Sequence, residues 1–270
     1  MYLLIAATIL LFPIILYVYW IIKYHESLDV YKYLGKSKET EIKILIIYPH
    51  PDDESAFSGG LISQLSKKDN IDVTVASITH GEKGDEFVKI PGYKLALVRK
   101  REYLKALNKL GPVESLIWHF KDGEVSDYEE DIKEQLKDYI VTNNFELVVT
   151  YEKNGPYPHP DHMSLSRIIH ELSNELKSFK PLYSTIPVKI YKLANMPNEL
   201  HFGDKIISLE KANPANAKYK LSIYKDLVSK YKALSSYKSQ NIKRGMPLWF
   251  KILLMPYEYY TDEWEKIRQK

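Results

Sequence analysis

Two short motifs combine imidazole and carboxylate side chains at spacings suited to holding a metal ion and moving protons. Residues 49–54 read PHPDDE, which places one imidazole and three carboxylates within five positions. Residues 159–162 read HPDH; if a helix begins near Pro160, His159 and His162 lie three positions apart and can point to the same side. Histidine and carboxylate ligands with an open coordination position suit a catalytic zinc ion, and the remaining groups can transfer protons.

The first motif has a simpler interpretation when it is taken alone. Asp52 or Asp53 at the start of a helix is favoured by capping and by the helix dipole. The same His-Pro-Asp order at a second loop favours the metal-site interpretation, in which the two loops meet.

The elements that must position these motifs alternate along the chain. Short apolar runs predict strands, and apolar residues at helical spacing predict helices. The predicted strands are residues 43–48, 71–79, 115–120 and 145–151, followed by 188–193 and 205–210. The predicted helices are residues 54–67, 93–110, 128–141, 161–176 and 215–237. Strands separated by such helices imply right-handed crossovers, and therefore an α/β fold with a Rossmann-like parallel sheet in a three-layer sandwich.

Both motifs follow predicted strands. In sheets of this kind, ligands bind beyond the carboxyl ends of the strands, where the strand order changes direction. The other two early strands also end in polar loops, 80–84 and 121–124, which contain further histidine and carboxylate residues. The sequence therefore predicts one polar rim at the carboxyl edge of the sheet.

The composition excludes several other kinds of site. The 270 residues include no cysteine, which rules out a thiol nucleophile, an iron–sulfur cluster and a cysteine-ligated zinc. A net charge of +3, from 38 basic and 35 acidic residues, does not indicate a nucleic-acid partner. The sequence has neither the Gly-x-Ser-x-Gly motif of serine hydrolases nor the Gly-x-Gly-x-x-Gly motif of dinucleotide-binding proteins.

The N-terminal stretch predicts a membrane anchor. Residues 2–22 carry no charge over 21 positions, and about 20 such residues cross a bilayer core. A cleaved signal peptide is the alternative, but the stretch lacks a basic start and a small-residue cleavage site. We expect a single transmembrane helix within residues 1–23 and a charged tether over 24–42. Because lysines follow the span, we expect the catalytic domain on the cytoplasmic side of the membrane.

The C-terminal tail leaves two interpretations open. The catalytic domain is expected to span residues 43–244, which leaves an aromatic tail over 245–270. Residues 246–260 read MPLWFKILLMPYEYY, too short and too interrupted by proline to cross a bilayer. This tail either lies in the membrane interface, with its aromatic rings at headgroup level, or packs on the domain.

Taken together, the motifs resemble those of the PIG-L/LmbE superfamily of zinc-dependent de-N-acetylases, whose members remove an acetyl group from N-acetylglucosamine units. Besides the two His-Pro-Asp motifs, four more segments are similar and occur in the family's order: THGEKG at 79–84, RKRE at 99–102, FKDG at 120–123, and KAL at 232–234 with SQ at 239–240. The chain departs from many members in the tyrosine-proline pairs before both histidine motifs. Asp161 is similar to the prokaryotic branch rather than to the eukaryotic glycolipid enzymes.

The resemblance implies the roles of five residues. It implies His50, Asp53 and His162 as ligands of Zn²⁺, with iron, cobalt or manganese as alternative metals. It implies Asp52 as the general base that takes a proton from the attacking water. It implies His159 as the group that stabilises the oxyanion of the tetrahedral intermediate.

Four further residues have two interpretations each. By resemblance, Arg99 and Asp122 bind the sugar or its headgroup, and the alternatives are a structural salt bridge and a turn carboxylate. Glu54 and Asp161 would support the metal ligands from behind, and the alternative is that each simply favours the start of its helix.

We therefore expect a membrane-tethered zinc hydrolase that removes an N-acetyl group from an N-acetylglucosamine-type sugar, either free or linked to a lipid or inositol. One alternative is a metal hydrolase of another amide or ester. A second is a non-catalytic, membrane-anchored sugar-binding scaffold. The expected partners are an N-acetylated amino sugar and the lipid bilayer, with no nucleic acid. Metal content distinguishes the scaffold from the enzymes, and substrate profiling distinguishes the two enzymes.

Overall fold

The structure is a computed structural model that describes residues 12, 26–84, 88–155, 157–187, 199–202, 205–208, 216–240 and 256–265. Within these ranges, no helix is both long enough and apolar enough to cross a bilayer. The span predicted over residues 2–22 lies outside the described residues, except for Phe12.

An eight-stranded sheet forms the centre of the described fold, with strand order β1-β9-β10-β6-β5-β2-β3-β4. Its strands are β1 (Glu26–Ser27), β2 (Ile42–Tyr48), β3 (Ile71–Thr79), β4 (Glu114–Phe120), β5 (Leu147–Tyr151), β6 (Lys180–Thr185), β9 (Tyr219–Ser222) and β10 (Tyr257–Thr261). Strand β2 pairs in parallel with β3 on one side and β5 on the other, so that Ile44 lies opposite both Val73 and Leu147. The strand order therefore changes direction between β2 and β5.

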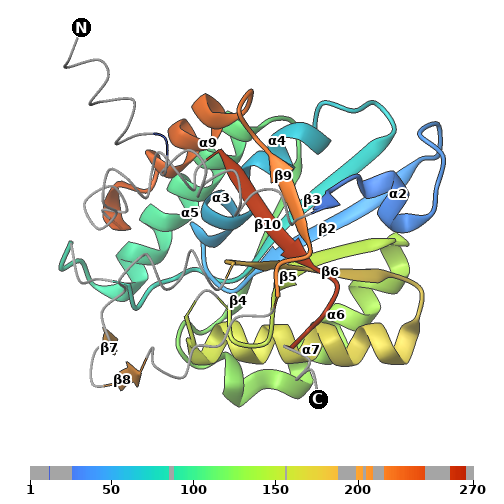
Figure 1. Ribbon diagram of the computed structural model, residues 1–270. Coiled ribbons are helices and arrows are strands. Elements are labelled where there is room, and N and C mark those ends of the chain that lie inside the picture. Colours follow the sequence, from blue (N-terminus) through green and yellow to red (C-terminus); the bar gives the residue numbers. More distant parts are fainter. Residues whose placement is uncertain are drawn as a thin grey trace, which may run out of the picture.

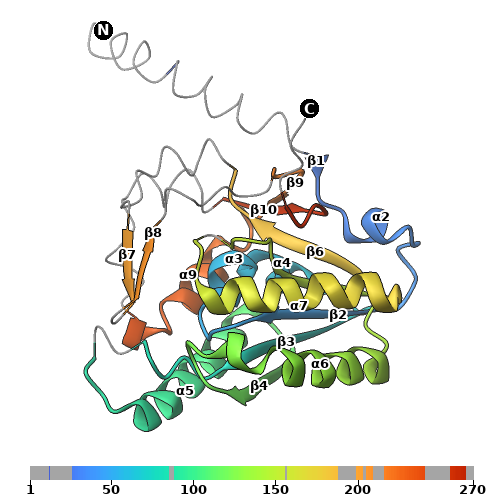
Figure 2. The ribbon, with the colours of Figure 1, turned by 90° about the horizontal axis from the view of Figure 1, so that it is seen from below.

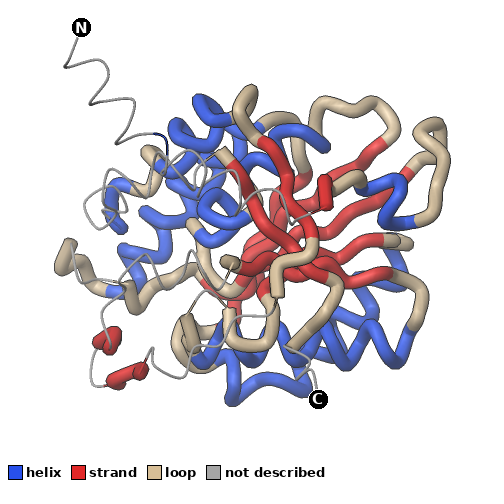
Figure 3. Tube along the Cα trace, viewed as in Figure 1, coloured by secondary structure: helices blue, strands red, loops and turns tan. Residues whose placement is uncertain are grey.

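Helices cover both faces of the sheet, which makes three layers (Figures 1, 2 and 3). One face carries α3 (Asp53–Phe57), α4 (Gly59–Leu65), α5 (Gly92–Leu110) and α9 (Leu227–Leu234), and the other carries α6 (Glu129–Asn143) and α7 (Pro160–Leu176). Strand β2 contributes to both cores: Ile44 and Ile46 belong to the first, and Leu45 and Ile47 to the second. A strand buried on both faces must be a continuous apolar run, which is how this segment reads in the sequence.

Local capping explains where several helices begin and end. Helix α7 begins with Pro160, and the side chain of His159 before it accepts a hydrogen bond from the Asp161 amide. Helix α6 carries Glu129, Glu130 and Asp131 in its first turn, where the helix dipole favours negative charge. The predicted α/β three-layer fold is confirmed.

The sheet is mixed, and the prediction of an entirely parallel sheet is wrong. Strand β10 runs antiparallel to both β6 and β9, with Tyr259 opposite Thr185 and Lys220. Because β10 comes from the predicted tail, the domain does not end at residue 244. For residues 257–261 the packing interpretation of the tail is correct, since Tyr259 and Tyr260 are buried. Residues 241–255 lie outside the described part of the chain.

Residues 26–42 belong to the domain, so the predicted tether over 24–42 is wrong for them. Strand β1 pairs with β9, and helix α2 (Val30–Leu34) is capped by Asp29, whose Oδ1 accepts from the amides of Tyr31 and Lys32. The side chains of Val30 and Tyr31 join the core. These apolar residues within a charged stretch hold the segment to the sheet.

The long helix predicted over residues 215–237 is also partly wrong. Residues 219–222 form β9, and the helix α9 begins only at Leu227. Pairing with β10 and burial of Leu221 and Ile223 outweigh the helical pattern. The strand predicted from residue 205 is confirmed as β8 (Lys205–Ser208), which pairs with β7 (Glu199–Phe202) in a separate two-stranded sheet. The strand predicted over 188–193 lies outside the described residues.

Candidate active site

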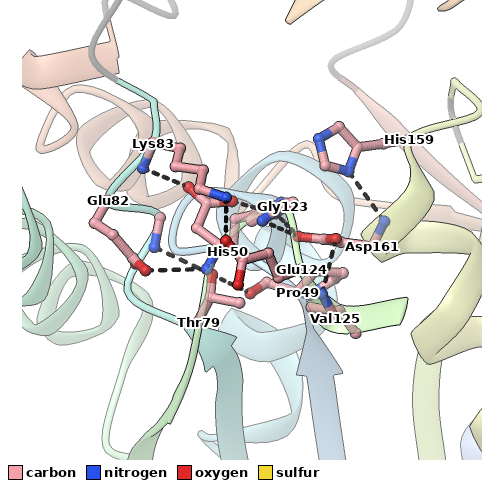
Figure 4. A network of polar contacts seen from close by, with 12 residues as sticks. Pro49, His50, Thr79, Glu82, Lys83, Gly123, Glu124, Val125, His159 and Asp161 are labelled. Atoms are coloured by element: carbon pink, nitrogen blue, oxygen red, sulfur yellow. Dashed lines mark hydrogen bonds and ion pairs between the residues drawn. The ribbon is translucent and has the colours of Figure 1, made fainter. Parts of the chain in front are cut away.

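The candidate site lies where the strand order changes direction. The loop after β2 carries the first motif, and the loop after β5 leads into the second motif at the start of α7. The polar loops after β3 and β4 border the same edge of the sheet. Figure 4 shows side chains from all four connections gathered beyond the ends of the strands. The site is thus at the place where this class of sheet binds ligands.

Three side chains there form a metal-binding donor set. One ligand atom each of His50, Asp53 and His162 lies within 4.8 Å of the others. Oδ2 of Asp53 is 3.4 Å from Nδ1 of His50 and 3.5 Å from Nε2 of His162. His162 is 0% exposed, and neither of its ring nitrogens has a hydrogen-bond partner among the residues that the structure describes. A buried imidazole without partners is costly unless a ligand satisfies it, so this residue fits a metal ion.

The electrostatics of two members of this set match the same role. Burial lowers the pKa of His162 to about 3, which keeps its ring neutral. Burial opposes the ionisation of Asp53, but His162 and His50 outweigh it and lower the pKa of Asp53 to about 2. A neutral imidazole and an ionised carboxylate are the protonation states in which these groups bind metal.

Two carboxylates flank the ring of His50. Its Nε2 is 3.1 Å from Oδ1 of Asp122 and 3.1 Å from Oδ2 of Asp161. Burial favours the neutral ring, but Asp122 and Asp161 outweigh it and raise the pKa of His50 well above its usual value. Metal binding at His50 must therefore release a proton.

Asp161 also connects this ring to the neighbouring loop. Its Oδ2 accepts from the Gly123 amide at 2.7 Å, and its Oδ1 accepts from the Val125 amide at 3.3 Å (Figure 4). The sequence left two interpretations of Asp161: support of a metal ligand, or a contribution to the start of its helix. The structure shows that Asp161 contacts a candidate ligand, His50.

A second donor set, His50, His159 and Asp161, is also within metal-binding distance. Its members already bond to one another: His50 with Asp161, and Nδ1 of His159 with the Asp161 amide at 3.2 Å. The set containing His162 fits a metal ion better, because the ring nitrogens of His162 have no hydrogen-bond partner within the described part of the chain.

Asp52 and His159 border the donor set. Asp52 is partly exposed, and its Oδ2 accepts from Arg99 at 3.0 Å. Burial raises the pKa of Asp52 to about 7, although Arg99 opposes the shift. The ring centroid of His159 lies 4.9 Å from that of His50 and 5.0 Å from that of His162, and burial lowers the pKa of His159 to about 4.

Arg99 and Asp122, predicted to bind substrate, both form bonds within the protein. Arg99 is 2% exposed and donates to the carbonyls of Gly81 and Pro51, besides Asp52. A Cβ atom at Gly81, where φ is +66°, would lie only 2.5 Å from the guanidinium. Asp122 contacts His50 and accepts from the Lys83 amide at 2.8 Å. The structure thus shows a salt bridge of Arg99 with Asp52 and a bond of the loop carboxylate Asp122 with His50, and a role of either residue in substrate binding stays a prediction.

Glu54 is buried behind Asp52 rather than in contact with a metal ligand's side chain. Its Oε2 accepts from the Asp52 amide at 2.9 Å, and its Oε1 accepts from Tyr237 at 2.6 Å. Tyr237 was not predicted as a functional residue, although it lies between the two short matches to the family at 232–234 and 239–240. The sequence pattern likewise did not indicate the contact of His119, whose Nδ1 is 3.0 Å from Nε2 of His80.

The fold and site thus define an α/β protein with a His/Asp metal-type site at the switch point of its sheet. Comparison with known proteins points to a family. A family model described as GlcNAc-PI de-N-acetylase (PIG-L) matches residues 45–173. This match, over just under half of the chain, supports the resemblance to the PIG-L/LmbE superfamily.

Individual relatives agree with that resemblance. The "Probable N-acetyl-alpha-D-glucosaminyl L-malate deacetylase 2" of Bacillus subtilis (strain 168) is 33% identical over 147 residues, 51% of this chain and 64% of the relative. A 1D-myo-inositol 2-acetamido-2-deoxy-alpha-D-glucopyranoside deacetylase of Corynebacterium efficiens is 27% identical over 162 residues, 52% of this chain. The match spans about half, 51%, of that relative's length.

A solved structure shows the same fold. The N,N'-diacetylchitobiose deacetylase from Pyrococcus horikoshii superimposes with a TM-score of 0.58 at 19% identity, covering 86% of this chain and 89% of that one.

Proposed function

We propose that this protein is a metal-dependent hydrolase that removes the N-acetyl group from an N-acetylglucosamine-type sugar. The observation that carries the proposal is the donor set of His50, Asp53 and His162, with the partly exposed Asp52 beside it. The names of the relatives support the substrate class, because they describe deacetylases of N-acetylglucosaminyl compounds.

The donor set fits zinc, which prefers nitrogen and oxygen ligands and keeps an open position in catalytic sites. When bound, zinc supplies a Lewis acid that polarises the acetamide carbonyl and makes water more acidic. Asp52 accepts the proton of the attacking water and delivers it to the leaving amine. With a pKa of about 7, its carboxylate suits both transfers near neutral pH.

His159 can stabilise the oxyanion because of its tautomer. Its Nδ1 accepts a hydrogen bond from the Asp161 amide, and the low pKa keeps the ring neutral. The ring's single proton therefore resides on Nε2, which is a donor. A donor aimed at the developing negative charge lowers the barrier to amide hydrolysis.

Acetate release tests the proposal directly. The detergent-purified full chain, loaded with zinc, should release acetate from members of a panel of N-acetylglucosaminyl lipids, inositols and oligosaccharides. The double variant His50→Ala/His162→Ala should lose both the metal and the activity. Stoichiometric metal with no activity on the panel would favour a hydrolase of another amide or ester. A wild type that binds no metal would favour the scaffold.

We further propose that the chain is anchored by residues 2–22, with the catalytic domain on the cytoplasmic side. The uncharged stretch and the lysines after it support this proposal. A substrate linked to a lipid would then lie at the same surface as the enzyme. Extraction of cell membranes with alkaline carbonate tests anchoring, and protease protection in sealed vesicles tests orientation. Release of the protein by carbonate would contradict the anchor.

A further inference from the structure

The chain returns to the candidate site after α9. Residues 237–240, the clamp segment, contact three parts of the site. The Tyr237 hydroxyl donates to Oε1 of Glu54 at 2.6 Å. Ser239 donates its amide and its hydroxyl to Glu102 of α5, at 2.9 and 2.6 Å. The Gln240 side chain donates to the Gly84 carbonyl at 3.0 Å, in the loop after β3.

The contact of Tyr237 leads to the backbone of Asp52. The second oxygen of Glu54, Oε2, accepts the Asp52 amide at 2.9 Å. One carboxylate therefore joins the clamp segment to the residue that borders the metal donor set. Tyr237 is 2% exposed and Glu54 is 1% exposed, so water does not compete for these bonds.

The backbone of Asp52 needs such a support. Its φ is 117° and its ψ is −31°, a conformation that residues with a side chain rarely adopt. Strained conformations of this kind persist only where surrounding contacts hold them, and they often occur at functional sites. Asp52 has no side-chain capping bond to its own helix, so the bond to Glu54 is one of the contacts that fix its amide.

We propose that Tyr237 is a positioning residue: through Glu54 it holds the Asp52 backbone so that the carboxylate faces the donor set. The inference rests on the proposed function, in which Asp52 is the base. Without the tyrosine hydroxyl, Glu54 loses one of the partners that fix its carboxylate. The Asp52 amide is then held less firmly, and the carboxylate samples positions from which proton transfer is inefficient.

The variant Tyr237→Phe removes only the hydroxyl, and Tyr103→Phe is a matched control. Tyr103 lies in the same core cluster, is also buried, and donates to the Val75 carbonyl at 2.9 Å. Amide hydrogen exchange at Asp52 reports directly on the bond to Glu54. We expect it to be about tenfold faster in Tyr237→Phe and unchanged in Tyr103→Phe. We also expect kcat to fall about tenfold, with KM within about twofold and metal content unchanged.

A double variant tests whether the two residues act together. The combination of Tyr237→Phe with Glu54→Ala should lower kcat no further than Glu54→Ala alone, because Glu54→Ala already removes both bonds of the connection. Equal exchange at Asp52 in Tyr237→Phe and Tyr103→Phe would overturn the inference, as would faster exchange with an unchanged kcat. If the wild type releases no acetate, the proposed function fails, and the exchange rate still decides whether Tyr237 holds Asp52.

Discussion

The segment that matches the family and the segment near the C-terminus contribute differently to the site. Residues 45–173 supply every candidate metal ligand found in the described part of the chain. Residues 216–240 and 256–265 supply no ligand, but they supply Tyr237, Ser239 and Gln240 behind the site and two strands of the sheet. The first segment carries the reactive groups, whereas the second holds them in place.

A buried carboxylate, Glu258, attaches the second segment to the first and is itself paired with a lysine of its own segment. Lys230 of α9 donates to Oε1 of Glu258 in β10 at 2.6 Å, and both side chains are buried. The same carboxylate accepts the amides of Gly60 and Leu61, at 2.6 and 2.9 Å, at the start of α4. Each carboxylate oxygen therefore has partners, which is the condition under which a buried charge is tolerated. Variants in the first segment therefore test the chemistry of the site, and variants in the second segment test the contacts that support it.

The largest effect is expected from His162→Ala in the first segment. Loss of this ligand should abolish metal binding and reduce acetate release by about 10³-fold or more, and a chelator should do the same to the wild type. Metal analysis of the purified protein and an acetate assay measure both effects. His119→Ala, at an exposed position of β4, is the control and should keep its metal. Full metal content in His162→Ala would contradict the assigned donor set.

Asp52→Asn should reduce kcat by about 10²- to 10⁴-fold, the usual contribution of a general base, while the metal stays bound. The amide keeps the size of the side chain but cannot accept a proton. Steady-state kinetics and metal analysis on the same sample separate this effect from ligand loss. A kcat within a few-fold of wild type would remove Asp52 from the role of base.

In the second segment, Glu258→Gln should lower the free energy of unfolding by about 3–5 kcal/mol, because it leaves the Lys230 ammonium buried without a countercharge. Urea denaturation measures the change. The control is Glu265→Gln. Glu265 and its partner Lys153 are both solvent-accessible, so this variant should lower the free energy of unfolding by less than about 1 kcal/mol. Equal losses in the two variants would show that burial of the Lys230–Glu258 pair adds nothing to its contribution to stability.

Gly60→Ala should destabilise the protein by about 1–3 kcal/mol through overpacking where the two segments meet. A Cβ atom there would lie 2.2 Å from the side chain of Ile223. Gly60→Ala combined with Ile223→Ala should destabilise the protein by less than the sum of the two single changes, and a thermodynamic cycle measured by urea denaturation gives the coupling. At Gly59 the nearest atom is 3.2 Å away on the flexible Lys230, so Gly59→Ala should cost less. Strictly additive effects at 60 and 223 would contradict the close contact.

The difference between the segments also explains what the sequence could predict. Residues 44–48 of β2 are a continuous apolar run, and the motif follows immediately, so both the element and the polar rim could be recognised locally. The general rule that ligands bind at the switch point of the sheet predicted that the two histidine loops meet, whereas the choice of His50 and His162 as ligands came from the resemblance to the family.

The supporting contacts could not be predicted in this way. Tyr237 and Glu54 are 183 positions apart, and nothing near either residue indicates the other. Arg99 has the charge of a substrate-binding residue. It is buried because Gly81 and Gly84 leave room for its guanidinium, and this room is seen only once the loop is folded. The five residues of β10 form a strand by pairing with β6 and β9, and the local sequence does not show this pairing. From the sequence alone, its aromatic residues were therefore as compatible with a membrane interface as with packing on the domain.

The position of β10 also bears on how the chain folds while it is being synthesised. The strands from β2 to β6 are complete once residue 185 has emerged, but their neighbour β10 ends only at residue 261, which is 76 residues later. At about 5–20 residues per second, synthesis leaves the edge of β6 unpaired for roughly 4–15 s. Strand β1 waits as well, because its partner β9 begins 193 residues after Glu26. An unpaired edge invites pairing with other chains, so the nascent protein is most prone to aggregation during this interval.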